Sequence, residues 1–139
     1  LYAVTSPVAP ATRSHLDVPC IETPGAGYVA DLDTALEDDR LDTPLLTVAA
    51  DLPLLDGETL DFALGAHDEG SLSVLVPAER KRSLGVSDDT TFRRAGREVA
   101  PTGVNVVGED GDDVWLTEDR RVAVNVNTLA DARVAEQFL

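Results

Sequence analysis

The sequence contains no methionine, one cysteine and few aromatic residues, which make up 4% of its 139 positions. With Cys20 as its single thiol, the chain can form neither an internal disulfide nor a cysteine cluster for zinc. No apolar run reaches the roughly 18–20 residues of a membrane-spanning helix, and no signal peptide is visible. These absences favour a cytoplasmic protein without a membrane span.

Basic residues are scarce as well. The 11 Lys and Arg residues face 26 Asp and Glu residues, which gives a net charge of −15, and Lys81 is the only lysine. This charge opposes binding to nucleic acid or to an anionic membrane. An acidic excess with almost no lysine is typical of a halophilic, high-salt cytoplasm, where the Debye length is only about 3 Å at 1 M and the repulsion is screened. Since 43% of the residues are hydrophobic, we expect one folded domain over residues 1–139.

The prediction of the fold and of the site starts from the stretch Thr43–Pro53, TPLLTVAADLP. Its continuous apolar run, without polar alternation, predicts a strand covered on both faces, as in a parallel sheet flanked by helices. Asp51 then lies at the carboxyl end of the strand, where open α/β sheets bind ligands. We expect Asp51 to hold a metal ion against a nucleotide; the alternative is that it only caps the next turn.

Strands and helices alternate along the rest of the chain, which predicts an α/β class with a mainly parallel sheet. Residues 78–100 show only loop, with a hairpin around Ala95 and Gly96. Asp56 is a plausible N-cap, and Thr128 with Asp131 forms a T-x-x-D helix start. Strands are expected at 1–5, 18–22, 45–50, 71–76, 103–107, 113–117 and 121–126, and helices at 10–16, 28–36, 56–67 and 128–138.

Two kinds of segment carry candidate chemistry. Gly25 and Gly27 lie in a turn between a strand and a helix, where backbone N–H groups can approach an anionic ligand, although an ordinary tight turn explains them too. Asn105, Asn125 and Asn127 interrupt apolar, β-branched runs, where a buried amide needs partners. If 121–126 is a strand, Asn125 and Asn127 share a face at its carboxyl end. With Asp51 they could complete the oxygen shell of Mg²⁺ beside substrate phosphates, or they could merely satisfy turn backbone.

Six of the eleven cations lie between Arg80 and Arg97. This cluster is either a phosphate-binding loop, because arginine pairs bidentately with phosphate, or a solvated surface paired with neighbouring acids.

Several segments, taken in order, resemble one family. The chain is similar from end to end to the archaeal GTP:adenosylcobinamide-phosphate guanylyltransferases of cobalamin (coenzyme B12) synthesis. The last two segments also recur in other nucleotidyltransferases, such as the molybdenum-cofactor guanylyltransferases. The segments are SPVAPATRSHL, ETPGAGYVADL, LLTVAADLPLL, VLVPAE, PTGVNVV and VAVNVNTLADARVAE.

The resemblance implies a Rossmann-like, three-layer nucleotidyltransferase fold that moves GMP from GTP to adenosylcobinamide phosphate and releases pyrophosphate. It implies that Asp51 binds the metal, with Asn125 and Asn127 as further metal-side ligands. Gly25 and Gly27 would face the nucleotide. Gly103 and Asn105 would line the acceptor side. A molybdenum-cofactor guanylyltransferase, or a non-catalytic nucleotide-binding remnant, is the alternative.

The family opens with a strand and a glycine-rich GGxGTR-type loop that should precede Leu1. Because the chain starts in an apolar strand and lacks methionine, we expect it to be N-terminally incomplete. We therefore expect these 139 residues alone to bind GTP poorly and to turn over negligibly.

Overall fold

In a computed structural model all residues from Leu1 to Leu139 are described, and the chain divides into two compact units, Leu1–Asp42 and Thr43–Leu139. The single domain expected over 1–139 stays a prediction. No helix in either unit has the length and apolar character needed to cross a membrane.

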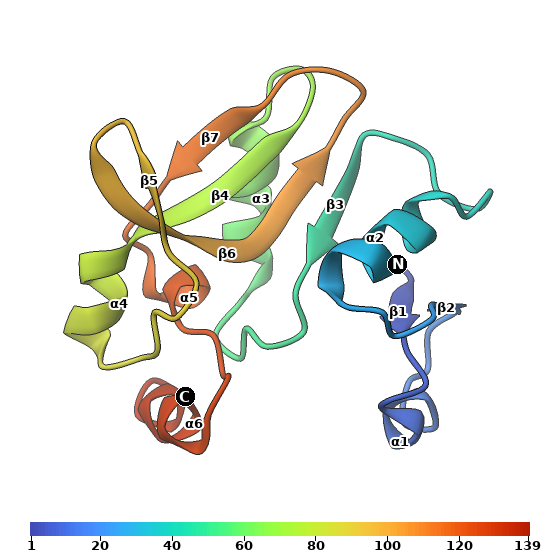
Figure 1. Cartoon of the computed structure of the whole chain (residues 1–139), viewed down its shortest axis with the longest axis horizontal. Coiled ribbons are helices and arrows are strands. Elements are labelled where there is room, and N and C mark those ends of the chain that lie inside the picture. The colour runs from blue at the N-terminus through green and yellow to red at the C-terminus, as the bar shows by residue number, and fades with distance from the viewer. The chain divides into compact units, whose positions relative to one another are not determined.

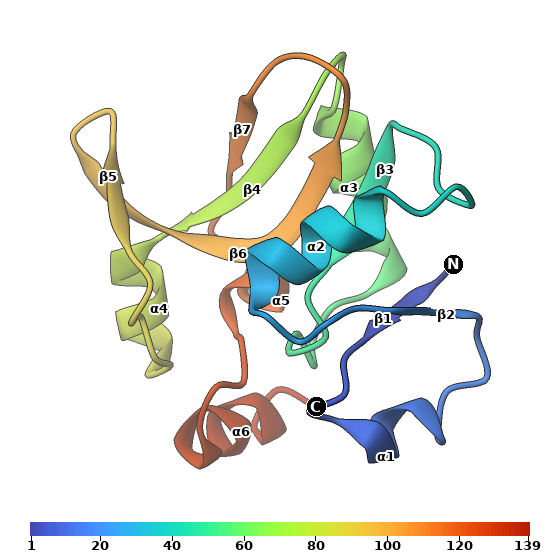
Figure 2. The ribbon, with the colours of Figure 1, turned by 45° about the vertical axis from the view of Figure 1, so that its right-hand side comes forward.

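The first unit is built on two short parallel strands, in which Ala3 pairs with Cys20 and Thr5 with Glu22 (Figure 2). A proline at the start of α1 costs no intrahelical hydrogen bond. All four elements expected here are confirmed, although α1 is shorter than predicted. They are β1 (Ala3–Thr5), α1 (Pro10–Arg13), β2 (Cys20–Glu22) and α2 (Tyr28–Leu36).

The second unit contains a five-stranded sheet and four helices (Figure 1). Its strands are β3 (Leu45–Val48), β4 (Leu72–Pro77), β5 (Phe92–Arg94), β6 (Arg97–Val107) and β7 (Asp113–Leu116). Its helices are α3 (Gly57–Ala66), α4 (Ala78–Leu84), α5 (Arg120–Ala123) and α6 (Leu129–Glu136).

The strand order of the sheet is β3-β6-β4-β7, with β5 also paired to β6. Strand β4 is parallel to β7, whereas β6 is antiparallel to β3, β4 and β5. Four strands therefore share one direction and β6, between β3 and β4, opposes them. The α/β class is confirmed, but the sheet is mixed rather than mainly parallel, because β4 and β7 are the one parallel pair among its four strand pairs.

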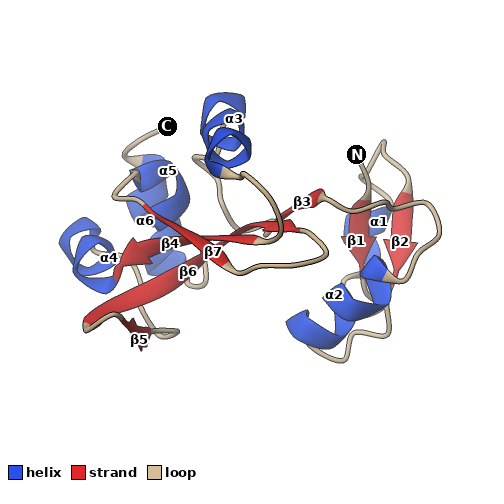
Figure 3. Cartoon of the chain, turned by 90° about the horizontal axis from the view of Figure 1, so that it is seen from above, coloured by secondary structure: helices blue, strands red, loops and turns tan.

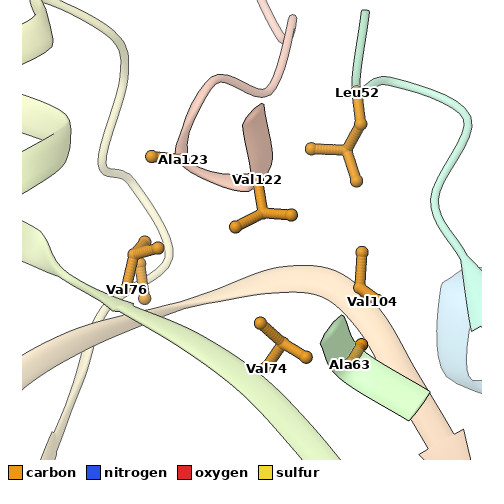
Figure 4. Packing of buried hydrophobic residues seen from close by; sticks show 8 residues of the cluster. Leu52, Ala63, Val74, Val76, Val104, Val122 and Ala123 are labelled. Atoms are coloured by element: carbon orange, nitrogen blue, oxygen red, sulfur yellow. The ribbon is translucent and has the colours of Figure 1, made fainter. Parts of the chain in front are cut away.

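Helices α3 and α5 cover one face of this sheet (Figure 3). Val122 of α5 approaches Val74 and Val104 of the sheet, and Leu52 lies beside it (Figure 4). The buried cluster is Leu52, Ala63, Val74, Val76, Ala100, Val104, Val122 and Ala123. Burying such side chains contributes about 1.5–3 kcal/mol each for the larger ones, so this face holds the core that positions the loops described below.

Both predicted helix caps are confirmed. The Asp56 carboxylate accepts from Thr59 N–H at 2.9 Å at the start of α3. Thr128 and Asp131 form a reciprocal capping box at the start of α6. Helix α6 buries Asp131 and Ala135, whereas Leu129 in its first turn is 82% exposed.

Two stretches fold differently from the prediction. Residues 121–126 were expected as a strand, but Asp119 caps the one-turn helix α5 there by accepting from Arg121 N–H. The apolar run within residues 121–126 reflects the complete burial of Val122, Ala123 and Val124. A short apolar run does not distinguish a buried helix from a strand. Within 78–100 the hairpin is confirmed, with Ala95 and Gly96 at positive φ, but helix α4 was missed.

The stretch Thr43–Pro53 also differs from the prediction in one respect. Strand β3 lies at the edge of the five-stranded sheet, and its residues are half-buried or exposed rather than covered on both faces. Asp51 nevertheless follows its carboxyl end, as predicted.

Candidate functional site

Asp51 lies in the turn that joins β3 to α3. Its backbone carbonyl accepts from Val126 N–H at 2.9 Å, and the next residue, Leu52, is anchored in the core. The Asp51 carboxylate is half-buried. The turn is therefore held on two sides while its acidic side chain keeps access to solvent.

Asn125, 74 residues further along, brings its side-chain amide to this carboxylate. Asn125 is only 8% exposed, and its Nδ2 donates to Asp51 Oδ1 at 3.4 Å and to the Thr102 carbonyl at 3.1 Å. Its Oδ1 accepts from Lys81 Nζ at 2.7 Å. Because an ammonium can only donate and the other two partners only accept, the amide has one possible orientation. Asn125 thus presents N–H, and not oxygen, to Asp51.

Lys81 is the third member of the cluster. It extends from α4, is 4% exposed, and donates to the Ala123 carbonyl at 2.9 Å as well as to Asn125. Burial lowers its pKa, while the charges of Asp131, Asp51 and Asp88 oppose that shift. An isolated buried ammonium is costly, so these two acceptors and the nearby carboxylates are what make its position tolerable.

Strand β6 is irregular where it passes the cluster, and it contributes a backbone acceptor there. Ser73 pairs with Asn105 but Leu75 pairs with Pro101, so β6 advances four residues while β4 advances two. The resulting bulge aims the Thr102 carbonyl at Asn125, and the buried Thr102 hydroxyl donates to the Val74 carbonyl at 2.9 Å. Bulges of this kind re-aim groups at the rims of sheets.

Gly103 follows in the bulge with φ +86°. Its carbonyl accepts from Ala49 N–H at 2.8 Å, and a Cβ on Gly103 would lie 2.5 Å from the Ala49 Cβ. The glycine is therefore explained by the close approach of β6 to the end of β3. Asn105 lies further along β6, half-buried and next to the buried Val104 and Val106, and no side-chain bond joins it to Asp51.

The side chain of Asn127 forms no hydrogen bond with Asp51 or Asn125. It is exposed, and its backbone N–H donates to Asp131 Oδ2 at 3.1 Å. The premise that strand alternation puts both asparagines on one face is wrong, because no strand forms over 121–126. Of the predicted residues of this unit, the structure brings together Asp51 and Asn125, with Gly103 beside the end of β3.

Asp131 fixes the segment that carries these asparagines. It is 1% exposed and accepts from Ser87 and Thr128 through both backbone and side chain. Burial opposes its ionisation, but these hydrogen bonds outweigh that effect and lower its pKa to about 2. Asp131 therefore ties the loop after α4 to the start of α6.

Gly25 and Gly27 lie in the first unit, both at positive φ. The backbone N–H groups of Gly25 and Ala26 donate to the Asp31 carboxylate at 2.8 and 3.2 Å. Asp31 of α2 thus accepts the amide hydrogen bonds that the sequence prediction assigned to a nucleotide.

The cations between Arg80 and Arg97 separate into two kinds. Arg82 and Arg97 form exposed ion pairs with acids, among them Asp88, Glu98 and Glu79. Lys81 alone is buried. Sequence reasoning missed this role for Lys81, although its being the only lysine in an arginine-containing cluster was a signal.

At this site Asp51 is the one carboxylate that a metal ion could use. No group of three or more His, Cys, Asp and Glu side chains is placed to hold a metal, so the protein does not build a complete metal cage. Mg²⁺ is commonly bound by one or two carboxylates and completes its shell with water and substrate phosphates. Asp51, half-buried at a strand end, fits that description.

No family model and no curated protein matches the sequence. Among solved structures, a hypothetical transferase from Thermus thermophilus is similar, with a TM-score of 0.53 and 20% identity over 76% of this chain. The chain spans 45% of that protein's length. The likeness is one of fold, and it confirms a Rossmann-like α/β architecture.

Proposed function

We propose that this chain belongs to a nucleotidyltransferase that moves GMP from GTP to adenosylcobinamide phosphate. Three features support the proposal: the order of the family-like segments, the fold shared with a hypothetical transferase, and the acidic turn at the end of β3. The single observation that carries it is the contact between Asp51 and Asn125. This hydrogen bond joins residues 74 positions apart in the sequence and supports a site to which both segments contribute.

The reaction needs no protein nucleophile. The terminal phosphate of the acceptor attacks the α-phosphorus of GTP, a new P–O–P bond forms, and the bond to pyrophosphate breaks in line. Catalysis of this kind depends on orienting two anions and neutralising their charge. On a chain of net charge −15, that neutralisation is the main requirement.

In this proposal Asp51 would hold Mg²⁺, which when bound would supply the positive charge that the phosphates need. Asn127, whose side chain is exposed at the start of α6, would serve on the metal side. Gly103 and Asn105 would line the acceptor side, on the strand beside β3. Gly25 and Gly27 would face the nucleotide once an anion competes with Asp31 for the loop amides.

The test is a nucleotidyl-transfer assay on the whole protein to which this chain belongs. GTP, Mg²⁺ and adenosylcobinamide phosphate should yield adenosylcobinamide-GDP and one pyrophosphate per turnover. Molybdopterin serves as the competing acceptor: transfer to molybdopterin alone would replace the acceptor in this proposal. No pyrophosphate release with either acceptor would overturn it.

A further inference from the structure

We infer that Lys81 is a positioning residue that orients the Asp51 carboxylate through the side-chain amide of Asn125. This inference rests on the proposed function in one respect, namely that Asp51 is the metal-binding carboxylate. It assigns Asn125 a different role from the one that the sequence predicted, because Asn125 then acts as a hydrogen-bond donor and not as a metal ligand.

Two hydrogen bonds connect Lys81 to Asp51 through Asn125. Lys81 Nζ donates to Asn125 Oδ1 at 2.7 Å, and Asn125 Nδ2 donates to Asp51 Oδ1 at 3.4 Å. The ammonium fixes which end of the amide points toward it, so the opposite end must point N–H at the carboxylate. Without Lys81, the Asn125 amide oxygen would lose its donor, and the amide would be held only by its two N–H bonds to Asp51 and to the Thr102 carbonyl.

The scaffold around Lys81 makes this orientation rigid. Its second bond, to the Ala123 carbonyl at 2.9 Å, holds the ammonium at the end of α5. The Thr102 carbonyl in the β6 bulge takes the other N–H of Asn125 at 3.1 Å. Lys81, Thr102 and Asp51 thus reach one amide from three other segments, and its polar atoms are all satisfied, as no buried side-chain N or O lacks a partner.

Position 81 is occupied by the only lysine of the chain, and the chemistry of lysine suits this position. Each of the other ten basic residues is arginine. Arginine has a wide planar fork, whereas lysine offers a compact ammonium with three donors on a flexible stem. A compact cation is what fits between the Ala123 carbonyl and the Asn125 amide.

The experiment uses the full chain and measures Mn²⁺ binding, with and without GTP, by electron paramagnetic resonance. The parent should bind Mn²⁺, and Asp51→Asn should abolish that binding. Lys81→Met and Asn125→Asp should each weaken it by about tenfold or more. The double variant Lys81→Met/Asn125→Ala should bind Mn²⁺ no more weakly than the weaker of Lys81→Met and Asn125→Ala measured singly, because the two residues act through one series of contacts.

Arg82→Met is the matched control, since Arg82 is the next residue of α4 but forms exposed ion pairs. It should bind Mn²⁺ like the parent. Thermal unfolding gives the Tm of each variant. Mn²⁺ binding is then compared at a temperature well below every Tm, where all the variants are folded. If Lys81→Met unfolds, the Asn125→Asp variant, which keeps the lysine, decides the question alone.

Asn125→Asp separates the two roles of that residue. A ligand role predicts equal or tighter Mn²⁺ binding, since a carboxylate replaces an amide oxygen. The donor role predicts weaker binding, since the N–H to Asp51 is lost. Any of three results would overturn the inference. They are Mn²⁺ binding that is unchanged in folded Lys81→Met, Mn²⁺ binding that is tighter in Asn125→Asp, and the absence of any Mn²⁺ binding that depends on Asp51. Nucleotidyl transfer is assayed separately, so a failure of the proposed function shows as absent transfer in a parent that binds Mn²⁺ through Asp51.

Discussion

Gly103 and Ala49 lie so close together that the β6 backbone passes the end of β3 with no room for a side chain, because a Cβ at position 103 would stand 2.5 Å from that of Ala49. Gly103 also has φ +86°, a conformation that costs other residues about 1–2 kcal/mol. The bulge that aims the Thr102 carbonyl at Asn125 depends on this glycine.

We predict that Gly103→Ala lowers the free energy of unfolding by about 2–4 kcal/mol, through backbone strain and steric overlap together. Denaturant unfolding measures the change. Gly65→Ala in α3 is the control, because nothing lies within 4 Å of a Cβ there and alanine favours a helix by about 0.5–1 kcal/mol. Equal stability of the two variants would contradict the account of the bulge.

Asp131 should make stability depend on pH at the acid end. Its pKa in the folded chain is about 2, against an ordinary value of 3.8, so its stabilisation is complete above about pH 4 and is lost as the pH falls toward 2. The shift corresponds to about 2 kcal/mol. Asp131→Asn should lose this amount at pH 7 and flatten the stability profile between pH 4 and 2.

Glu136→Gln provides the comparison for Asp131→Asn, because Glu136 lies on the same helix but is exposed. Its profile should match that of the parent. An Asp131→Asn profile that keeps the parent's slope below pH 4 would show that another carboxylate is responsible.

The acidic surface predicts a strong effect of salt. With 26 acidic and 11 basic residues, self-repulsion should exceed the exposed ion pairs, which contribute little individually. Raising KCl from 0.1 to 2 M at pH 7 should therefore raise Tm by about 5 °C or more. At about pH 4.5, where carboxylates begin to take up protons, the increase should shrink; a fall of Tm with salt at pH 7 would refute this prediction.

The sequence predicted the elements that carry local signals. Asp56 and Thr128 mark the starts of α3 and α6 in the sequence, because a helix cap is a contact between residues at most four positions apart. Asp51 was located because a strand followed by an acid and a proline is a local pattern. The hairpin at Ala95 and Gly96 was located for the same reason.

What the sequence left open depends on contacts between distant segments. The run around Val122 was taken for a strand because its burial comes from the sheet beneath α5 and not from any neighbour in sequence. Lys81 was grouped with surface arginines, since only the fold brings the Asn125 amide to it across 44 residues. The Asp31 contact with the glycine turn was missed, although it spans six residues, because a carboxylate inside a helix carries no signal of where it points.

The central claim is that Asp51 anchors the metal ion of a nucleotidyltransferase. The most direct measurement is the rate of pyrophosphate release from GTP and adenosylcobinamide phosphate by Asp51→Asn, with Asp61→Asn, an exposed carboxylate of α3, as the control. We predict a fall of at least about 10²-fold for Asp51→Asn, the scale on which one preorganised electrostatic group acts, and parent-like turnover for Asp61→Asn. Parent-like turnover in Asp51→Asn would contradict the claim and leave Asp51 as the cap of a turn.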